Sequence, residues 1–144
     1  MLLGMPAMNN LLLDTHVFIW LMNGDATLPL KVRKNIASAL VEGNVYLSAI
    51  SCWEIAMLEQ RKRIVLTKPC LEWINEGLSR SGIEILALTP GISVESCKLS
   101  EFTQGDPADR IIVASARLTN SVLVTRDKVL LAYGKKHHVM VMAT

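Results

Sequence analysis

Short apolar runs alternate with amphipathic segments along the chain. The apolar or β-branched runs predict strands over residues 11–13, 45–49, 83–88, 121–125 and 139–142. Apolar positions at helical spacing predict helices over 17–22, 30–42, 51–61, 69–81, 93–99, 111–118 and 129–133. Strands that are apolar on both faces and separated by helices are typical of a parallel sheet covered on two sides. We therefore expect an α/β sandwich with a central, mostly parallel sheet.

Residues that start or stop helices refine these boundaries. Thr89-Pro90 and Asp106-Pro107 each supply an N-cap followed by proline at the first helical position. Ser51 and Glu54 have the spacing of a capping box, which predicts that a helix opens at Ser51. Gly134 is expected to close the helix that begins near residue 129.

The length of 144 residues suits one domain. We assign residues 9–144 to that domain and expect residues 1–8, which show no periodicity, to be a dispensable N-terminal extension. Hydrophobic residues make up 51% of the chain, which excludes intrinsic disorder and indicates apolar surface buried against a partner. Asp14 interrupts the most apolar stretch, residues 11–22, so we expect no membrane span.

Charge and cysteine content limit the remaining classes. The net charge of +2 identifies no class of partner, and basic clusters at 31–34, 61–63 and 135–136 suit either phosphate contacts or a solvated helix face. Cys52, Cys70 and Cys97 are odd in number and lack C-x-x-C spacing, so they do not resemble a disulfide or zinc framework. They are typical of a reducing compartment, and we expect a cytoplasmic protein.

Four of the five aspartates lie where predicted elements meet. Asp14 follows the first strand directly, and Asp127 follows the strand over 121–125 closely. Because the carboxyl ends of parallel strands share one edge, both point to the same rim of the sheet. Glu54 and Asp109 lie in the first turns of predicted helices and can reach that rim, and Asp106 lies just before the second of these helices.

Carboxylates gathered in one cleft repel one another and raise each other's pKa, a conflict that a divalent cation removes. Oxygen ligands without His or Cys favour Mg²⁺ or Mn²⁺ over zinc. Thr15, Ser48 and Thr125 place hydroxyls near the same edge, where they can orient water or a carboxylate. The resulting hypothesis is a Mg²⁺ or Mn²⁺ site formed by Asp14, Glu54, Asp109 and Asp127.

Each acid also has a purely structural interpretation. Taken alone, Glu54 is better explained by the capping box, and Asp106 by an N-cap before Pro107. Asp109 can complement the helix dipole, and Asp127 can cap the next helix. Asp14 is the hardest to dismiss, because a carboxylate directly after three leucines needs a partner or open water. The case for a metal rests on four acids that share one edge.

The aromatic and histidine residues are assigned no chemistry. Trp20, Trp53 and Trp73 fall within helical segments, and we expect them to pack rather than to stack on bases. His16 is expected to lie at the surface at a helix start, and the histidines at 137–138 follow the last helix among basic residues.

Four segments of the chain, quoted with their residue numbers, resemble the acidic motifs of PIN-domain ribonucleases. They are LLLDTHV (11–17), SAISCWEIA (48–56), DPADRIIVA (106–114) and VTRD (124–127). Each segment alone is a weak signal, whereas four in this order and spacing are a strong one. The resemblance runs from about residue 9 to the C-terminus and is greatest to VapC-type toxins of bacterial toxin–antitoxin pairs.

The resemblance implies a PIN-like three-layer sandwich and a Mg²⁺- or Mn²⁺-dependent endoribonuclease. Carried over by motif, the catalytic and metal-binding acids fall on Asp14, Glu54, Asp109 and Asp127, with Thr125 and Asp106 in support. It also implies a homodimer, inhibited by a small antitoxin whose C-terminal segment occupies the cleft. Arg110 and Arg126 are our candidates for holding flanking phosphates of the RNA.

Two other functions stay open at this point. A phosphotransfer domain also gathers carboxylates at strand ends, although residues 14–16 lack the second acid that usually accompanies an aspartyl nucleophile. A non-catalytic module that binds RNA or protein would keep the acidic pocket as a scaffold. In the nuclease interpretation, water attacks the phosphodiester and leaves a 5′-phosphate and a 3′-hydroxyl.

Overall fold

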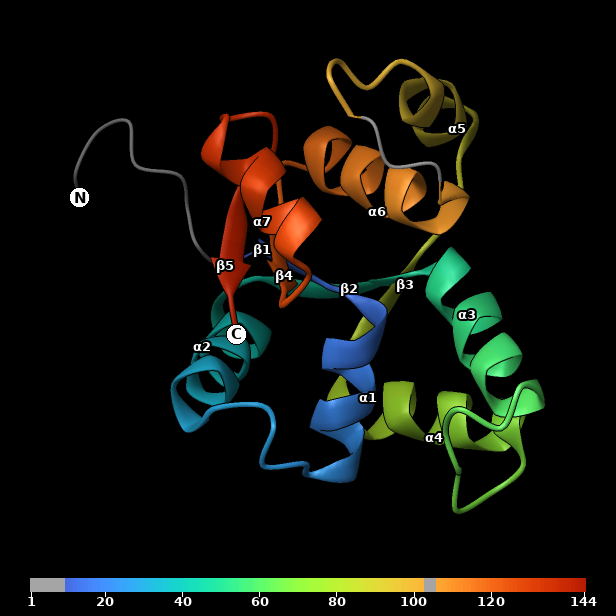
Figure 1. The fold of residues 1–144 in the computed structure, drawn as a ribbon. Helices are drawn as coiled ribbons and strands as arrows, with labels where there is room; N and C mark the ends of the chain where they lie inside the picture. The colour runs from blue at the N-terminus through green and yellow to red at the C-terminus, as the bar shows by residue number, and fades with distance from the viewer. Residues whose placement is uncertain (1–9, 103–105) are drawn as a thin grey trace.

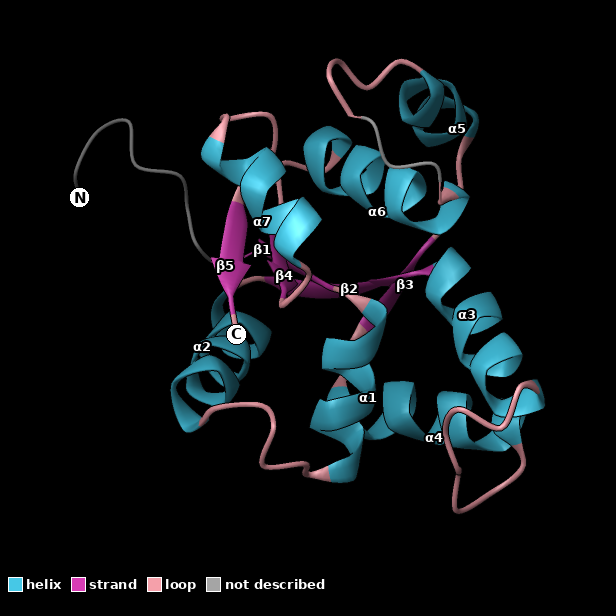
Figure 2. Cartoon of the chain, viewed as in Figure 1, coloured by secondary structure: helices cyan, strands magenta, loops and turns pink. Residues whose placement is uncertain are grey.

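Five parallel strands form the centre of a computed structural model that describes residues 10–102 and 106–144. They lie in the order β3-β2-β1-β4-β5, and every neighbouring pair is parallel. Figures 1 and 2 show this sheet between two layers of helices. The strand bounds are β1 (Asn10–Leu13), β2 (Asn44–Ser48), β3 (Glu84–Leu86), β4 (Val122–Thr125) and β5 (Val141–Ala143). The predicted three-layer α/β sandwich is confirmed.

Seven helices connect and cover these strands in the described part of the chain. Their bounds are α1 (Thr15–Asn23), α2 (Leu30–Glu42), α3 (Ala49–Gln60), α4 (Cys70–Ser81), α5 (Pro90–Cys97), α6 (Pro107–Leu118) and α7 (Lys128–Lys135). The helix predicted over 30–42 is confirmed to the residue, because its apolar positions and the following glycine agree. Thr89 and Asp106 cap α5 and α6 as expected, each accepting a hydrogen bond from a first-turn amide.

Strand β1 is buried on both faces, which fixes the layers. Leu11 and Leu13 join the cluster covered mainly by α1, α2 and α4, whereas Leu12 joins the cluster of α6 and α7. All three leucines are inaccessible to solvent. Figure 1 shows the same division, with α1, α2 and α4 below the sheet and α5, α6 and α7 above it.

The capping box predicted at Ser51 and Glu54 is wrong. Helix α3 begins at Ala49, and the Ser48 side chain caps it by accepting a hydrogen bond from the Ile50 amide. Ser51 therefore lies inside the helix, fully buried, and Glu54 lies in its second turn. The i, i+3 spacing of Ser51 and Glu54 suits both a capping box and two residues on one face of a helix. The helix begins earlier than predicted, so Ser48 is the N-cap residue.

Gly134 does not end α7, which continues to Lys135. A Cβ on Gly134 would lie 2.4 Å from Val141 Cγ2, closer than carbon atoms approach. Gly134 thus lets α7 lie directly on β5, so a tertiary contact explains a residue that local rules assign to a helix end.

The predicted extension over residues 1–8 lies outside the described residues. No helix in the ranges 10–102 and 106–144 is long and apolar enough to cross a membrane.

Candidate active site

Five acidic residues lie around the carboxyl edge of the sheet. Asp14 follows β1 and is the N-cap of α1, and Asp127 follows β4 and is the N-cap of α7. Glu54 is reached from β2 through α3, whereas Asp106 and Asp109 occupy the start of α6. Each acid thus sits where a chain segment leaves the sheet edge or where a helix begins beside it.

A threonine hydroxyl joins the acids that follow β1 and β4. Thr125 Oγ1 donates to Asp14 Oδ2 at 2.7 Å and accepts from the Asp127 amide at 3.0 Å. Thr125 is fully buried, so this arrangement is held by the last residue of a central strand. The other Asp14 oxygen accepts from the Thr15 amide at 2.9 Å. Thr125 therefore fixes the orientation of the Asp14 carboxylate.

A second threonine orients Glu54. Thr15 Oγ1 lies 2.6 Å from Glu54 Oε1 and 2.7 Å from Ser51 Oγ. A carboxylate only accepts, so the Thr15 hydroxyl donates to Glu54. Sequence analysis placed Thr15 near this edge but missed Ser51, whose contact spans 36 positions in the chain and leaves no local signal.

Burial disfavours the ionised form of two of these acids. Removal from water raises the pKa of Asp14, against the opposing effects of the hydrogen bonds from Thr125 and Thr15. Burial likewise raises the pKa of Glu54, where the nearby Asp14 and Asp106 charges add to the effect and Thr15 opposes it.

The pKa of Asp109 depends on all four of the other acids. Burial first, then the charges of the other four acids, raise its pKa from 3.8 to about 7. A carboxyl group whose pKa is raised in this way is buried and faces the negative charge of its neighbours. The four acids of the predicted metal site and Asp106 therefore lie close enough for the charges of the other four to raise the pKa of Asp109.

The site fits a hard divalent cation by donor type and by charge. Its charged donors are all carboxylate oxygens, and added positive charge would relieve the repulsion that contributes to the raised pKa of Asp109. Within the described residues, however, no group of three His, Cys, Asp or Glu side chains is already close enough to hold one ion. The acids thus surround the proposed cation site, but their side chains do not form a complete set of ligands.

The two candidate phosphate-binding arginines differ in position. Arg110 donates to the carbonyl oxygens of Ser96 and Phe102, at 3.2 and 3.0 Å, and its guanidinium lies over the Phe102 ring. These contacts hold the segment around α5 against α6. Arg126 instead lines a hollow of about 210 Å³ that also includes Asp14 and Asp127. Arg126 is therefore the arginine that the structure places beside the acids.

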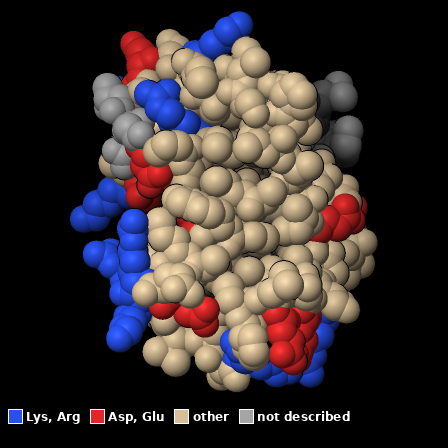
Figure 3. Space-filling model, turned by 90° about the vertical axis from the view of Figure 1, so that its right-hand side faces the viewer, with Lys and Arg blue, Asp and Glu red and all other residues tan. Residues whose placement is uncertain are grey.

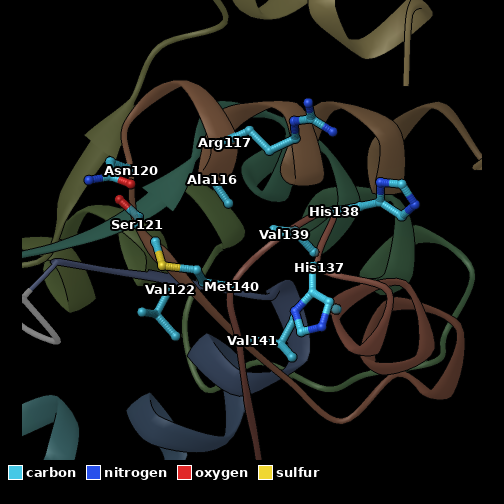
Figure 4. A pocket seen from close by; sticks show the side chains of 11 residues that line it. Ala116, Arg117, Asn120, Ser121, Val122, His137, His138, Val139, Met140 and Val141 are labelled. Atoms are coloured by element: carbon cyan, nitrogen blue, oxygen red, sulfur yellow. The ribbon is translucent and has the colours of Figure 1, made fainter. Parts of the chain in front are cut away.

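A separate, larger hollow of about 650 Å³ lies at the opposite edge of the sheet (Figure 4). Its walls come from the end of α6, the starts of β4 and β5, and the turn after α7. None of the five acids lines it. The chemistry predicted for the chain thus belongs to the carboxyl edge.

Comparison with known proteins agrees with this geometry. The family model described as PIN domain matches residues 11–136, which contain all five acids. The chain belongs to the PIN-domain family. Its four acidic segments therefore lie within a PIN domain, and the family resemblance predicted from them is confirmed.

One curated relative of this PIN domain is ribonuclease VapC22 from Mycobacterium tuberculosis. The two are 31% identical over 121 residues, which cover 84% of this chain and 89% of that protein. The two proteins are homologous over nearly their whole lengths.

Solved structures show the same fold at lower identity. VapBC2 from Rickettsia felis, bound to a DNA fragment from its promoter, gives a TM-score of 0.70 at 16% identity, covering 94% of this chain and 98% of that one. VapBC-1 from nontypeable Haemophilus influenzae gives 0.67 at 16% identity, covering 93% and 97%.

The burial of Asp109 and the neighbouring carboxylates together predict a pH-dependent stability. Its folded pKa of about 7 exceeds the ordinary 3.8, so the folded state loses stability as pH rises between these values. In EDTA, Asp109→Asn should therefore stabilise the protein at about pH 8, by on the order of 1–2 kcal/mol after allowance for solvent screening of a half-buried group. The gain should disappear near pH 4. Thermal unfolding at both pH values measures it.

The matched control is Asp25→Asn, the same change at the one aspartate outside the site. Asp25 is exposed, and the hydrogen bonds from Thr27 lower its pKa, so no gain at pH 8 is expected. If the two substitutions changed the stability equally at pH 8, the raised pKa of Asp109 would be contradicted.

Proposed function

We propose that this PIN domain is a Mg²⁺- or Mn²⁺-dependent endoribonuclease and the toxin of a type II toxin–antitoxin system. The observation that carries the proposal is the cluster of five carboxylates at one sheet edge. The charges of four of them add to burial in raising the pKa of the fifth, Asp109. The homology to ribonuclease VapC22 supports RNA as the substrate.

Asp14, Glu54, Asp109 and Asp127 would hold the cation in this proposal. A bound divalent cation supplies a water of lowered pKa and stabilises negative charge on the phosphate. Thr125 and Thr15 contribute by fixing Asp14 and Glu54 with one donated hydrogen bond each. Arg126, at the edge of the same hollow, would contact the RNA next to the scissile phosphate.

The attacking group is water. The hydroxyls closest to the acids, Thr15, Ser51 and Thr125, are buried and already hydrogen-bonded, so none of them is available as a nucleophile. Water adds to phosphorus as the bond to the 3′ oxygen breaks, which yields a 5′-phosphate and a 3′-hydroxyl. Since the 2′-hydroxyl is not needed for this reaction, preference for RNA must arise from binding.

Two protein partners are proposed, a small antitoxin and a second copy of the chain. Similar structures from Rickettsia felis and Klebsiella pneumoniae are described as a VapBC complex and a toxin–antitoxin complex, which supports the first. Figure 3 shows that the side of the molecule carrying α3 and α4 has an uncharged centre, with Lys and Arg along one border and further charged groups of both signs around the rest of its rim. Trp53, Val65 and Leu71, from α3, the α3–α4 loop and α4, expose large apolar side chains. Trp53 is thus not packed in the core as expected.

A dimer is therefore expected in solution. Sedimentation equilibrium at micromolar concentration should give twice the monomer mass, because two uncharged apolar faces can meet without like-charge repulsion. Trp53→Glu should shift the equilibrium to monomer, whereas Lys98→Glu, another exposed position, should not. A wild-type protein that is monomeric throughout would contradict the proposal.

The nuclease assay tests the central proposal. RNA should be cleaved with Mg²⁺ or Mn²⁺ and not with EDTA. Asp14→Asn should lower the rate at least about a hundredfold, because even residues that only support a metal ligand contribute 10–100-fold. It should stay folded, since an asparagine oxygen still accepts from the Thr15 amide.

Asp25→Asn is the matched control and should leave cleavage unchanged. A folded wild-type protein that binds RNA without cutting it under any metal condition would instead be a non-catalytic module. Full activity of folded Asp14→Asn would exclude the proposed site.

Glu54→Gln separates metal binding from folding. The glutamine oxygen still accepts from Thr15, so the melting temperature should change little. A neutral amide is a poorer ligand for a hard dication, so Mn²⁺ affinity and turnover should both fall about tenfold or more. Calorimetric Mn²⁺ titration and cleavage rates measure this, with Glu59→Gln on the same helix as control. Unchanged Mn²⁺ affinity would remove Glu54 from the site.

A further inference from the structure

A small hollow with aromatic walls adjoins the acidic site. Its volume is about 210 Å³, which corresponds to about seven waters at ~30 Å³ each and gives room for one flat heterocycle. Asp14 and Asp127 form its acidic side. We call the remaining lining, His16, Val17, Trp20 and Arg126, the aromatic subsite.

The two rings of the aromatic subsite come from successive turns of α1. His16 and Trp20 are four positions apart, so they share one face of the helix. Their ring centroids are 6.0 Å apart, with the planes inclined at 46°. His16 is exposed and Trp20 is partly buried, so the first ring is open to a ligand and the second is held by the protein.

Arg126 is fixed over the Trp20 ring, at the edge of the hollow. Its Nη2 donates to the Thr27 carbonyl at 2.7 Å, and its Nε donates to Thr144 Oγ1 at 3.1 Å. Its guanidinium carbon lies 4.9 Å from the Trp20 ring centroid, a cation–π contact. An exposed arginine with three partners has lost most of its freedom before any ligand arrives, which lowers the entropy cost of binding.

We infer that the aromatic subsite binds one nucleobase of the RNA, in the nucleotide next to the phosphate held at the acids. The inference rests on the proposed function and names a specificity site for it. Rings and guanidinium planes are the surfaces on which proteins stack unpaired bases. Without a bound cation, a phosphate alone is a poor occupant of the aromatic subsite, because Asp14 and Asp127 repel it from the acidic side.

The aromatic subsite positions the substrate and takes no part in the bond-breaking step. A base held by His16 and Arg126 would set which internucleotide phosphate reaches the acids. Loss of the subsite should therefore raise KM and alter the choice of cleavage site more than it lowers kcat.

Binding of nucleoside 5′-monophosphates tests the inference without any cleavage. With Mg²⁺ present, AMP, GMP, CMP and UMP are titrated while the His16 ring and Trp20 indole NMR signals are followed. At least one nucleotide should shift both signals strongly, and ribose 5-phosphate, which lacks the base and can reach only the cation at the acids, should cause much smaller shifts. His16→Ala and Arg126→Ala should each weaken binding about tenfold, the range for one stacking partner.

Arg63→Ala, an exposed arginine on the turn after α3, is the matched control and should bind as the wild type does. His16 and Arg126 are both exposed, so unchanged melting temperatures should accompany their loss of binding. The inference is overturned if ribose 5-phosphate shifts these signals by as much as the nucleotides do, or if His16→Ala and Arg126→Ala retain full affinity.

Cleavage of an RNA pool by the same variants separates failure of the aromatic subsite from failure of the proposed function. A changed cleavage-site preference with a raised KM supports the subsite. An active wild type with the same KM and preference in both variants overturns the subsite and leaves the ribonuclease intact. A wild type that binds nucleotides and cleaves no RNA supports the nucleobase site and overturns the ribonuclease.

Discussion

The burial of strand β1 on both faces is the constraint on which the rest of the structure depends. Leu11, Leu12 and Leu13 are inaccessible to solvent, so the strand can hold no charge along its length. The first charged side chain, Asp14, appears where the strand leaves the sheet. Because all five strands are parallel, the neighbouring chain segments leave at the same edge, and the charged residues that follow them meet there.

This meeting of charges opposes folding and is tolerated because local hydrogen bonds offset part of the cost. Thr125 and Thr15 each give a buried hydroxyl to one carboxylate, and helix amides satisfy Asp14 and Asp127. Burial, together with the charges of the other four acids, raises the pKa of Asp109 to about 7. A cluster of this kind stores unfavourable free energy in the unliganded protein, which binding of a cation can release.

Sequence patterns predicted the fold and the positions of Asp14, Asp109 and Asp127 because these depend on local order: a strand end, a proline after a cap, a short run before the next helix. They did not predict how Glu54 is held. Its spacing from Ser51 has two local solutions, and the choice was made by Ser48 and by a contact with Thr15 across the sheet edge. Contacts between distant segments, which propensity and periodicity do not encode, decided these cases.

The position of each acid on the backbone also determines how long its side chain has to be. Asp14, Asp106 and Asp127 are N-caps, and the short aspartate side chain is what lets a carboxylate reach its own helix amides. Glu54 lies almost two turns inside α3, and its longer side chain spans the distance to Thr15. An exchange of Asp for Glu at these positions conserves charge but misplaces the oxygens by one methylene. Within this site, the two acidic residue types are therefore not interchangeable.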